Sequence, residues 1–141
     1  MLWPGCYNPD KGALSPDSRT ELDLYAERFI DVEKKYLKVI EKLAQITEEA
    51  AAITQDQLAM EHIRKFASDN QRALDRIGTE FDGWQRYTDE RSLILFIQLL
   101  NDQPSARKLR VLAPQFRERI RYNAAYLAEY DALLGRFDLR H

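Results

Sequence analysis

Apolar residues between positions 22 and 53 recur at alternating spacings of three and four, the period of an α-helix with one buried face. The positions that follow this pattern are Leu22, Tyr25, Phe29, Val32, Tyr36, Val39, Leu43, Ile46, Ala50 and Ile53. Flanking apolar residues make the face wider than the seam of a two-stranded coiled coil. Because residues 17–54 contain no glycine or proline, the pattern predicts one rod of roughly 57 Å that contacts two neighbouring helices.

The start of this helix is marked by Ser15, Pro16 and Asp17. They supply a capping hydroxyl, a proline suited to the first helical turn and a carboxylate near the positive end of the helix dipole. The preceding residues 1–14 hold two of the five prolines and a turn sequence at residues 8–12. We therefore expect an extended N-terminal arm at residues 1–14.

The apolar pattern changes phase at residues 54–57, where Thr54 and Gln57 have the spacing of a capping box. A second helix is predicted from there to about Tyr87, with its seam at Met60, Ile63, Ala67, Asn70, Leu74, Ile77, Phe81 and Trp84. The phase shift indicates either a chain reversal between two helices or a stammer in one continuous rod. We favour the reversal.

Later in the chain, Thr88 and Asp89 mark either the start of a new helix or a bend in the second one. Residues 101–104 form the clearest loop, and a last helix is predicted to run to about Phe137 with a kink or break at Pro114. The predicted fold is all-α. It is an antiparallel bundle of three long helices, or four if the second is split near Thr88, forming a single helical-bundle domain over residues 15–141.

Composition agrees with helices, because five glycines and five prolines in 141 residues are too few for the frequent turns of a β-sandwich or barrel. The formal net charge is −2, but its distribution is uneven. Residues 1–62 carry 7 basic and 12 acidic side chains, whereas residues 103–141 carry 8 basic and 4 acidic ones. The chain is thus acidic first and basic last, without an overall field that attracts nucleic acid or an anionic membrane.

The single cysteine, Cys6, cannot form an intramolecular disulfide, which fits a reducing compartment, and we expect a cytoplasmic protein. The longest apolar run, residues 93–100, is far shorter than the ~20 residues that span a bilayer, so no membrane span is expected.

Catalytic chemistry finds little support in the sequence. His62 and His141 are the only histidines, and neither has a glutamate three residues before it, as a di-iron bundle requires. Glycine-rich phosphate loops are also missing. We expect no enzyme activity, no metal and no cofactor.

The run at residues 93–100 has seven apolar side chains in eight positions, so a helix there has no polar face. We favour a central position in the bundle for this helix; the alternative is a surface for a partner or for self-association. The candidate partner-binding residues are Leu93, Ile94, Phe96, Ile97 and Leu100.

A basic stripe is predicted on the last helix at Arg107, Arg110, Arg117 and Arg121, which could contact phosphates or face the acidic first helix. Asn70 and Asn123 occupy otherwise apolar seam positions. As a hypothesis, the two amides bond to each other and form a layer that fixes register and partner choice; alternatively, either amide tilts to the surface.

Together these patterns favour a non-catalytic helical interaction module, such as an adaptor, a small assembly subunit or a chaperone-like protein. It would bind a protein partner or a second copy of itself through apolar helix surfaces. One alternative is a small-molecule sensor with a pocket among Trp84, Tyr87 and Phe96. Another is nucleic-acid binding through the basic stripe, which the near-zero net charge disfavours.

Overall fold

The computed structural model describes residues 19–28 and 31–138, which form seven α-helices and no strand. In chain order the helices are α1 (Glu21–Arg28), α2 (Val32–Ala51), α3 (Asp56–Asp69), α4 (Gln71–Tyr87), α5 (Glu90–Asn101), α6 (Pro104–Ile120) and α7 (Ala124–Gly135). The predicted all-α class is confirmed, but the count of three or four long helices is wrong. The expected arm at residues 1–14 and the helix start at residues 15–17 lie outside the described residues.

The first predicted rod is divided in two. Thr20 and Asp23 cap α1 reciprocally: each side chain accepts the backbone N–H of the other residue, at 3.0 and 3.1 Å. Asp31 then caps α2, since its carboxylate accepts the backbone N–H groups of Glu33 and Lys34. The uninterrupted rod over residues 17–54 is therefore wrong, because Asp31 begins a second helix within it.

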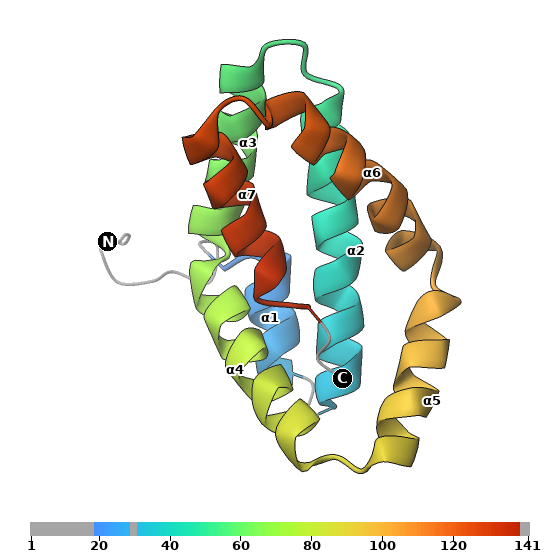
Figure 1. Ribbon diagram of the computed structural model, residues 1–141. Helices are drawn as coiled ribbons and strands as arrows, with labels where there is room; N and C mark the ends of the chain where they lie inside the picture. Colours follow the sequence, from blue (N-terminus) through green and yellow to red (C-terminus); the bar gives the residue numbers. More distant parts are fainter. Residues whose placement is uncertain (1–18, 29–30, 139–141) are drawn as a thin grey trace, which may run out of the picture.

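The chain reversal after this rod is confirmed. α2 ends at Ala51, α3 begins at Asp56, and the two helices run antiparallel as a hairpin (Figure 1). The predicted capping box at Thr54 is not formed, because the N-cap residue is Gln55 and its side chain makes no capping bond. Carbonyl groups of this loop bond instead to a distant arginine on α6.

The second predicted helix ends at Tyr87 as expected, but it is interrupted at Asn70, which closes α3 and opens α4. A new helix follows at the predicted split: Asp89 caps α5 by accepting the backbone N–H of Ser92 at 2.8 Å. The loop at residues 101–104 is also close to its predicted place, since α5 ends at Asn101 and α6 starts at Pro104.

The last predicted helix breaks at a different place from the one expected. Pro114 lies within α6, and the helix continues through it to Ile120. The chain turns at residues 121–123, and Asn123 caps α7 by accepting the backbone N–H of Tyr126 at 3.1 Å. The predicted break at Pro114 is wrong because an asparagine cap, rather than the proline, starts the new helix.

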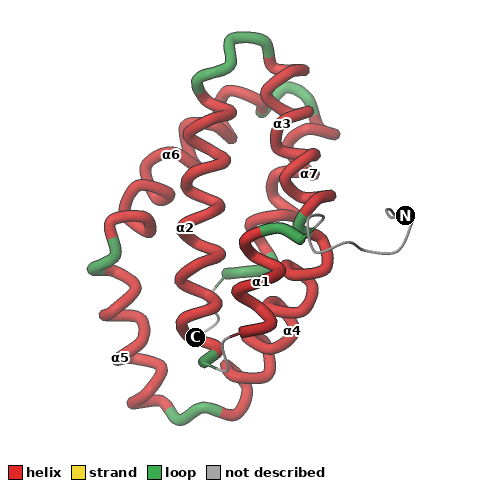
Figure 2. The backbone as a smooth tube through the Cα atoms, turned by 180° about the vertical axis from the view of Figure 1, so that it is seen from behind, coloured by secondary structure: helices red, strands yellow, loops and turns green. Residues whose placement is uncertain are grey.

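α2 is the centre of the fold, between α3 and α4 on one side and α6 on the other, with α7 crossing near them (Figures 1 and 2). Its seam residues Tyr36, Val39, Leu43, Ile46 and Ala50 are all buried, as the sequence pattern predicts. The buried polar groups on α2 are paired: Lys35 Nζ lies 2.8 Å from Glu80 Oε1, and Thr47 Oγ1 lies 2.8 Å from the Tyr130 hydroxyl. α2 is therefore the helix against which α3, α4 and α6 pack, and its buried polar side chains are hydrogen-bonded.

Candidate functional site

α5 lies at the edge of the molecule, away from the bundle centre (Figures 1 and 2). Its residues Phe96 and Leu100 are buried, and Phe96 enters an aromatic cluster from α2 and α4. The Phe96 ring centroid lies 5.2 Å from that of Trp84 and 5.6 Å from that of Tyr36, both in edge-to-face geometry. The favoured central position of this helix is therefore wrong, because only one side of it meets the bundle.

The outer side of α5 is apolar as well. Ile94, Leu95 and Leu99 are 47%, 55% and 44% exposed. Of the five predicted partner-binding residues, only Ile94 belongs to this outer face. Phe96 and Leu100 belong to the core, and Leu93 and Ile97 are half-buried. Leu95 and Leu99 were missed, because at about 100° per residue they project only about 100° and 60° away from Phe96, whereas Ile94 projects nearly opposite to it.

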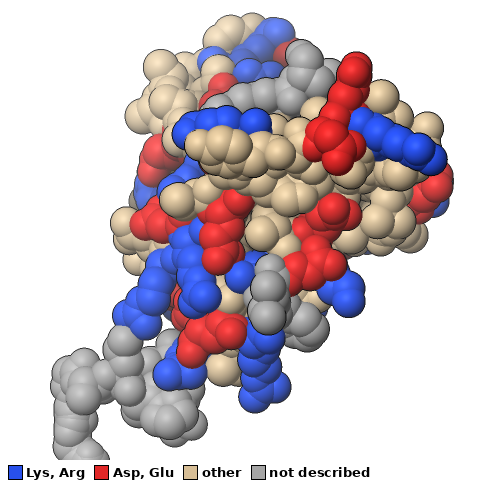
Figure 3. All heavy atoms as spheres, turned by 90° about the horizontal axis from the view of Figure 1, so that it is seen from below, with Lys and Arg blue, Asp and Glu red and all other residues tan. Residues whose placement is uncertain are grey.

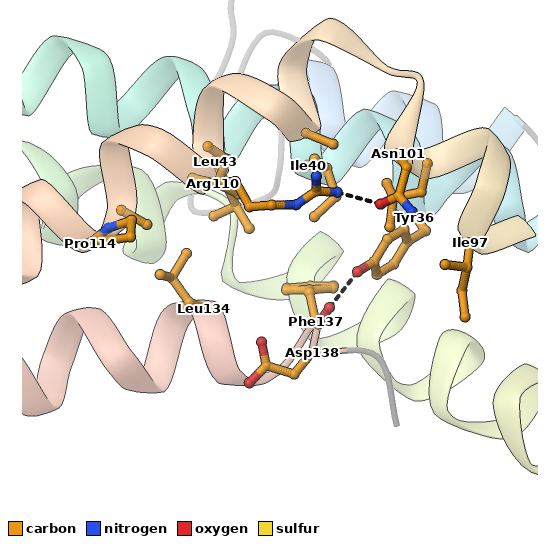
Figure 4. A pocket seen from close by; sticks show the side chains of 14 residues that line it. Tyr36, Ile40, Leu43, Ile97, Asn101, Arg110, Pro114, Leu134, Phe137 and Asp138 are labelled. Atoms are coloured by element: carbon orange, nitrogen blue, oxygen red, sulfur yellow. Dashed lines mark hydrogen bonds between the residues drawn. The ribbon is translucent and has the colours of Figure 1, made fainter. Parts of the chain in front are cut away.

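A groove of about 510 Å³ lies between α2, α5, α6 and the end of α7. Its apolar lining comes from Ile40 and Leu43 on α2, Leu109 and Ala113 on α6, and Leu134 on α7 (Figure 4). Ile97 and Leu100 of α5 close one end. The side chains of residues 93–100 thus lie in three environments. Some pack in the aromatic cluster, some line the groove and some are exposed on the outer face of α5.

Polar groups gather at the α5 end of the groove. The Arg110 guanidinium reaches from α6 to α5, where its Nη2 donates to Asn101 Oδ1, and Asp138 lies on the opposite wall beside Phe137 (Figure 4). The Tyr36 hydroxyl donates to the Phe137 carbonyl. Burial raises the pKa of Tyr36, with a smaller contribution from the negative charge of Asp138, so this hydroxyl stays neutral.

The aromatic pocket expected among Trp84, Tyr87 and Phe96 is not formed. Trp84 and Phe96 pack against each other, whereas Tyr87 is 83% exposed and turned to solvent. Tyr87 is the last residue of α4, so its side chain lies beyond the packed part of the helix. The groove described above lies beside this cluster.

Two of the four arginines in the predicted basic stripe pair with carboxylates. Arg117 makes two hydrogen bonds to Asp131, at 2.6 and 3.1 Å, and Arg121 pairs with Glu118. The Arg117–Asp131 contact raises the pKa of Arg117. Arg107 and Arg110 instead donate to uncharged oxygens, those of the Asp102 backbone and the Asn101 side chain. Within the described residues, these two are the stripe members without a carboxylate partner.

Asn70 and Asn123 are not brought together. Asn70 is buried, and its amide donates to the Phe66 carbonyl within the same turn at 2.9 Å. Asn123 is exposed and caps α7. The predicted asparagine layer is therefore wrong, because each amide bonds to nearby backbone at a helix end, the position that asparagine commonly takes.

Arg119 is a residue that the sequence analysis missed. Its guanidinium donates to the Asp56 carboxylate at 2.7 Å and to the carbonyls of Ile53 and Thr54 at 2.5 and 3.0 Å. Further bonds reach the carbonyls of Ala50 and Ala51 at the end of α2. α6 is thereby fixed to the α2–α3 loop. A helix that ends without a capping glycine was the one available signal that an outside donor is needed.

Lys108 pairs with Glu48 and so joins the basic last part of the chain to the acidic first part. Arg64 makes two hydrogen bonds to Glu129, which lower the pKa of that carboxyl. The face seen in Figure 3 carries acidic and basic side chains side by side. Within the described residues, the ion pairs between positions 1–62 and 103–141 are Lys108–Glu48 and Arg119–Asp56.

Comparisons with known proteins give no relative: no protein family, no curated protein and no solved structure matches this chain. Among the helices that the structure describes, none has both the length and the apolar character for crossing a bilayer. Over the same residues, no three His, Cys, Asp or Glu side chains are grouped in a way that could hold a metal ion.

Proposed function

We propose that this protein is a non-catalytic interaction module that binds a protein partner, or a second copy of itself, through the outer face of α5. The observation that carries the proposal is the exposure of Ile94, Leu95 and Leu99 on a helix that already anchors itself through Phe96 and Leu100. Three large aliphatic side chains on one exposed helix face form the kind of patch that interaction surfaces use.

The energetics support a surface rather than a poorly packed core. Full burial of a leucine or isoleucine side chain contributes about 1.5–3 kcal/mol, and roughly half of that remains available at each of the three positions. An amphipathic helix laid along α5 would realise this gain, in the manner of helix-in-groove recognition. Charged residues such as Arg91 border the face and could select the partner's charge pattern.

The test compares the wild type with the double variant Leu95→Glu/Leu99→Glu. The wild type is expected to bind an apolar dye or to gain mass with concentration in light scattering, and the double variant to lose this behaviour without a change in melting temperature. Leu58→Glu is the matched control, since Leu58 is 47% exposed on α3, apart from α5. A wild type that stays monomeric and binds no dye would refute the proposal.

The groove favours a second candidate function, the binding of a small molecule. Ligand sites of this class are mostly apolar clefts of about 300–1,000 Å³ with a few polar groups that orient the ligand. The groove of about 510 Å³, with Arg110, Asn101 and Asp138 at one end, matches that description.

We also propose that the protein does not bind nucleic acid, has no catalytic activity and is cytoplasmic. Nucleic-acid binding has little support, because Arg117 and Arg121 are engaged by carboxylates. The proposed absence of catalysis is supported by His62. Its imidazole lies on the exposed surface, and its Nε2 is 2.8 Å from Glu49 Oε1. A cytoplasmic location rests only on the single cysteine.

A further inference from the structure

We propose that the groove between α2, α5, α6 and α7 binds a single-chain amphiphile, a carboxylate with an unbranched aliphatic tail, with its head on Arg110 and Asn101. The inference rests on the second candidate function and names its ligand class. The protein-binding function of the outer face of α5 is independent of it.

The groove holds about 510 Å³, which is within the range of small-molecule sites. Its walls at Leu43, Ala113 and Leu134 are apolar, and polar side chains gather at its α5 end. An amphiphile with one aliphatic tail and one head group has the same division into an apolar and a polar part.

The sign of the head group follows from Arg110. A guanidinium has five N–H donors, and one hydrogen bond of Arg110, to Asn101 Oδ1, is seen here. Among the described residues, no carboxylate pairs with Arg110, in contrast to Arg117, Arg119 and Arg136. Because Asn101 Oδ1 accepts this hydrogen bond, the amide nitrogen of Asn101 remains as a second donor. Two groups rich in donors at one end of an apolar groove suit a carboxylate, which accepts bidentate bonds from arginine.

The remaining polar groups at this end set limits on the ligand. The Tyr36 hydroxyl donates to the Phe137 carbonyl and is neutral, so it adds no charge. Asp138 lies on the opposite wall, is exposed, and opposes an anionic head. Arg110 is exposed as well, so water screens both charges, and the direct contact with Arg110 outweighs the repulsion from the opposite wall. Removal of the Asp138 charge should therefore strengthen the binding of a carboxylate, whereas removal of the Arg110 charge should weaken it.

The experiment is calorimetric titration of the full chain at pH 8 with decanoate, decanol and decyltrimethylammonium, each kept below its aggregation concentration. Decanoate is expected to bind in a 1:1 ratio, and octanoate, which is two methylenes shorter, about sixteenfold more weakly, because each buried methylene contributes a factor of about four. Arg110→Gln should weaken decanoate binding by up to about fivefold, since Arg110 is exposed, while leaving decanol unchanged. Asp138→Asn should tighten decanoate binding by a few-fold.

Two controls separate this site from its surroundings. Arg107→Gln removes a neighbouring exposed arginine of the same helix that does not line the groove, and it should leave all affinities unchanged. Leu95→Glu/Leu99→Glu removes the outer face of α5 and should also leave decanoate binding intact. Circular dichroism of each variant confirms that the helices are retained.

The outcomes distinguish the carboxylate ligand class from small-molecule binding in general. If decanol or the cationic amphiphile binds as tightly as decanoate, or if Arg110→Gln and Arg107→Gln behave alike, the carboxylate class is wrong although the groove binds small molecules. If none of the three amphiphiles binds, the small-molecule function itself is wrong. If binding disappears with Leu95→Glu/Leu99→Glu alone, the amphiphile sits on the outer face of α5 and the groove is not its site.

Discussion

α2 and α5 show two ways in which an apolar helix is used in this molecule. α2 has 20 residues, nine of them buried, with polar side chains along the opposite side. α5 is more uniformly apolar, yet only two of its 12 residues are buried. The comparison teaches that periodicity, rather than total hydrophobicity, decides which helix becomes the centre of a bundle, because only a one-sided helix can satisfy core and water together.

The reason lies in the number of neighbours. α2 packs against α3 and α4 on one side and α6 on another, and its buried polar groups have partners in α4 and α7. α5 meets the bundle chiefly through the Phe96 ring, and the groove lies where a second neighbour would otherwise pack. An apolar helix in that position retains surface for binding.

The largest expected effect tests whether α5 depends on a single ring. Phe96→Ala removes the contacts to Tyr36, Phe81 and Trp84 and should lower the free energy of unfolding by about 3–5 kcal/mol. Leu95→Ala, on the exposed side, should cost less than about 0.5 kcal/mol. Urea denaturation measures both, and hydrogen exchange should show the α5 amides losing protection before those of α2. Equal costs for the two substitutions would contradict the comparison.

A smaller effect concerns the α2–α3 loop, to which Arg119 donates several hydrogen bonds, whereas Arg107 and Arg110 donate one each at the α5–α6 corner. Arg119→Ala removes the bonds to Asp56 and to the carbonyls at the end of α2, and should cost about 1.5–3 kcal/mol. Arg117→Ala is the matched control, because Arg117 and Asp131 form a more exposed pair worth about 0.2–1 kcal/mol. Thermal unfolding distinguishes the two, and the reverse order would show that the loop is held by other contacts.

The smallest effect is on the free energy of unfolding at alkaline pH. It comes from two buried tyrosines, Tyr36 on α2 and Tyr130 on α7. Burial raises the pKa values of Tyr36 and Tyr130, so both hydroxyls stay protonated in the folded protein while those of the unfolded chain ionise near pH 10. The unfolded state then binds fewer protons, and the stabilisation present below pH 10 is lost as the pH rises, by up to about 1.4 kcal/mol per pH unit for each tyrosine.

Tyr36→Phe should reduce this slope between pH 10 and 11 by about 1 kcal/mol, whatever its cost at neutral pH. Tyr87→Phe is the control, because Tyr87 is 83% exposed and changes its surroundings little on unfolding. Denaturation curves at several pH values give the slopes. Identical slopes for wild type and Tyr36→Phe would show that the hydroxyl ionises as readily in the folded state as in the unfolded chain.

Particular residues show where the sequence was informative and where it was not. The spacing of Tyr36, Val39 and Leu43 predicted a buried face, and these residues are buried. The chain reversal after α2 and the new helix after Thr88 were also readable. The breaks at Asp31, Asn70 and Asn123 were missed, although each residue is a good helix cap, because their neighbours continue the apolar period.

The helical class of this protein and the apolar side of α2 could be predicted from the residue pattern, because these properties depend on neighbours within a few residues of each other. The three-dimensional packing was needed to show which apolar residues of α5 face the core, that Arg119 fixes a loop 65 residues away, and that Arg110 and Asp138 share a groove. These contacts join residues that are far apart in the sequence. The helical periodicity of a segment does not indicate which other helix will pack against it.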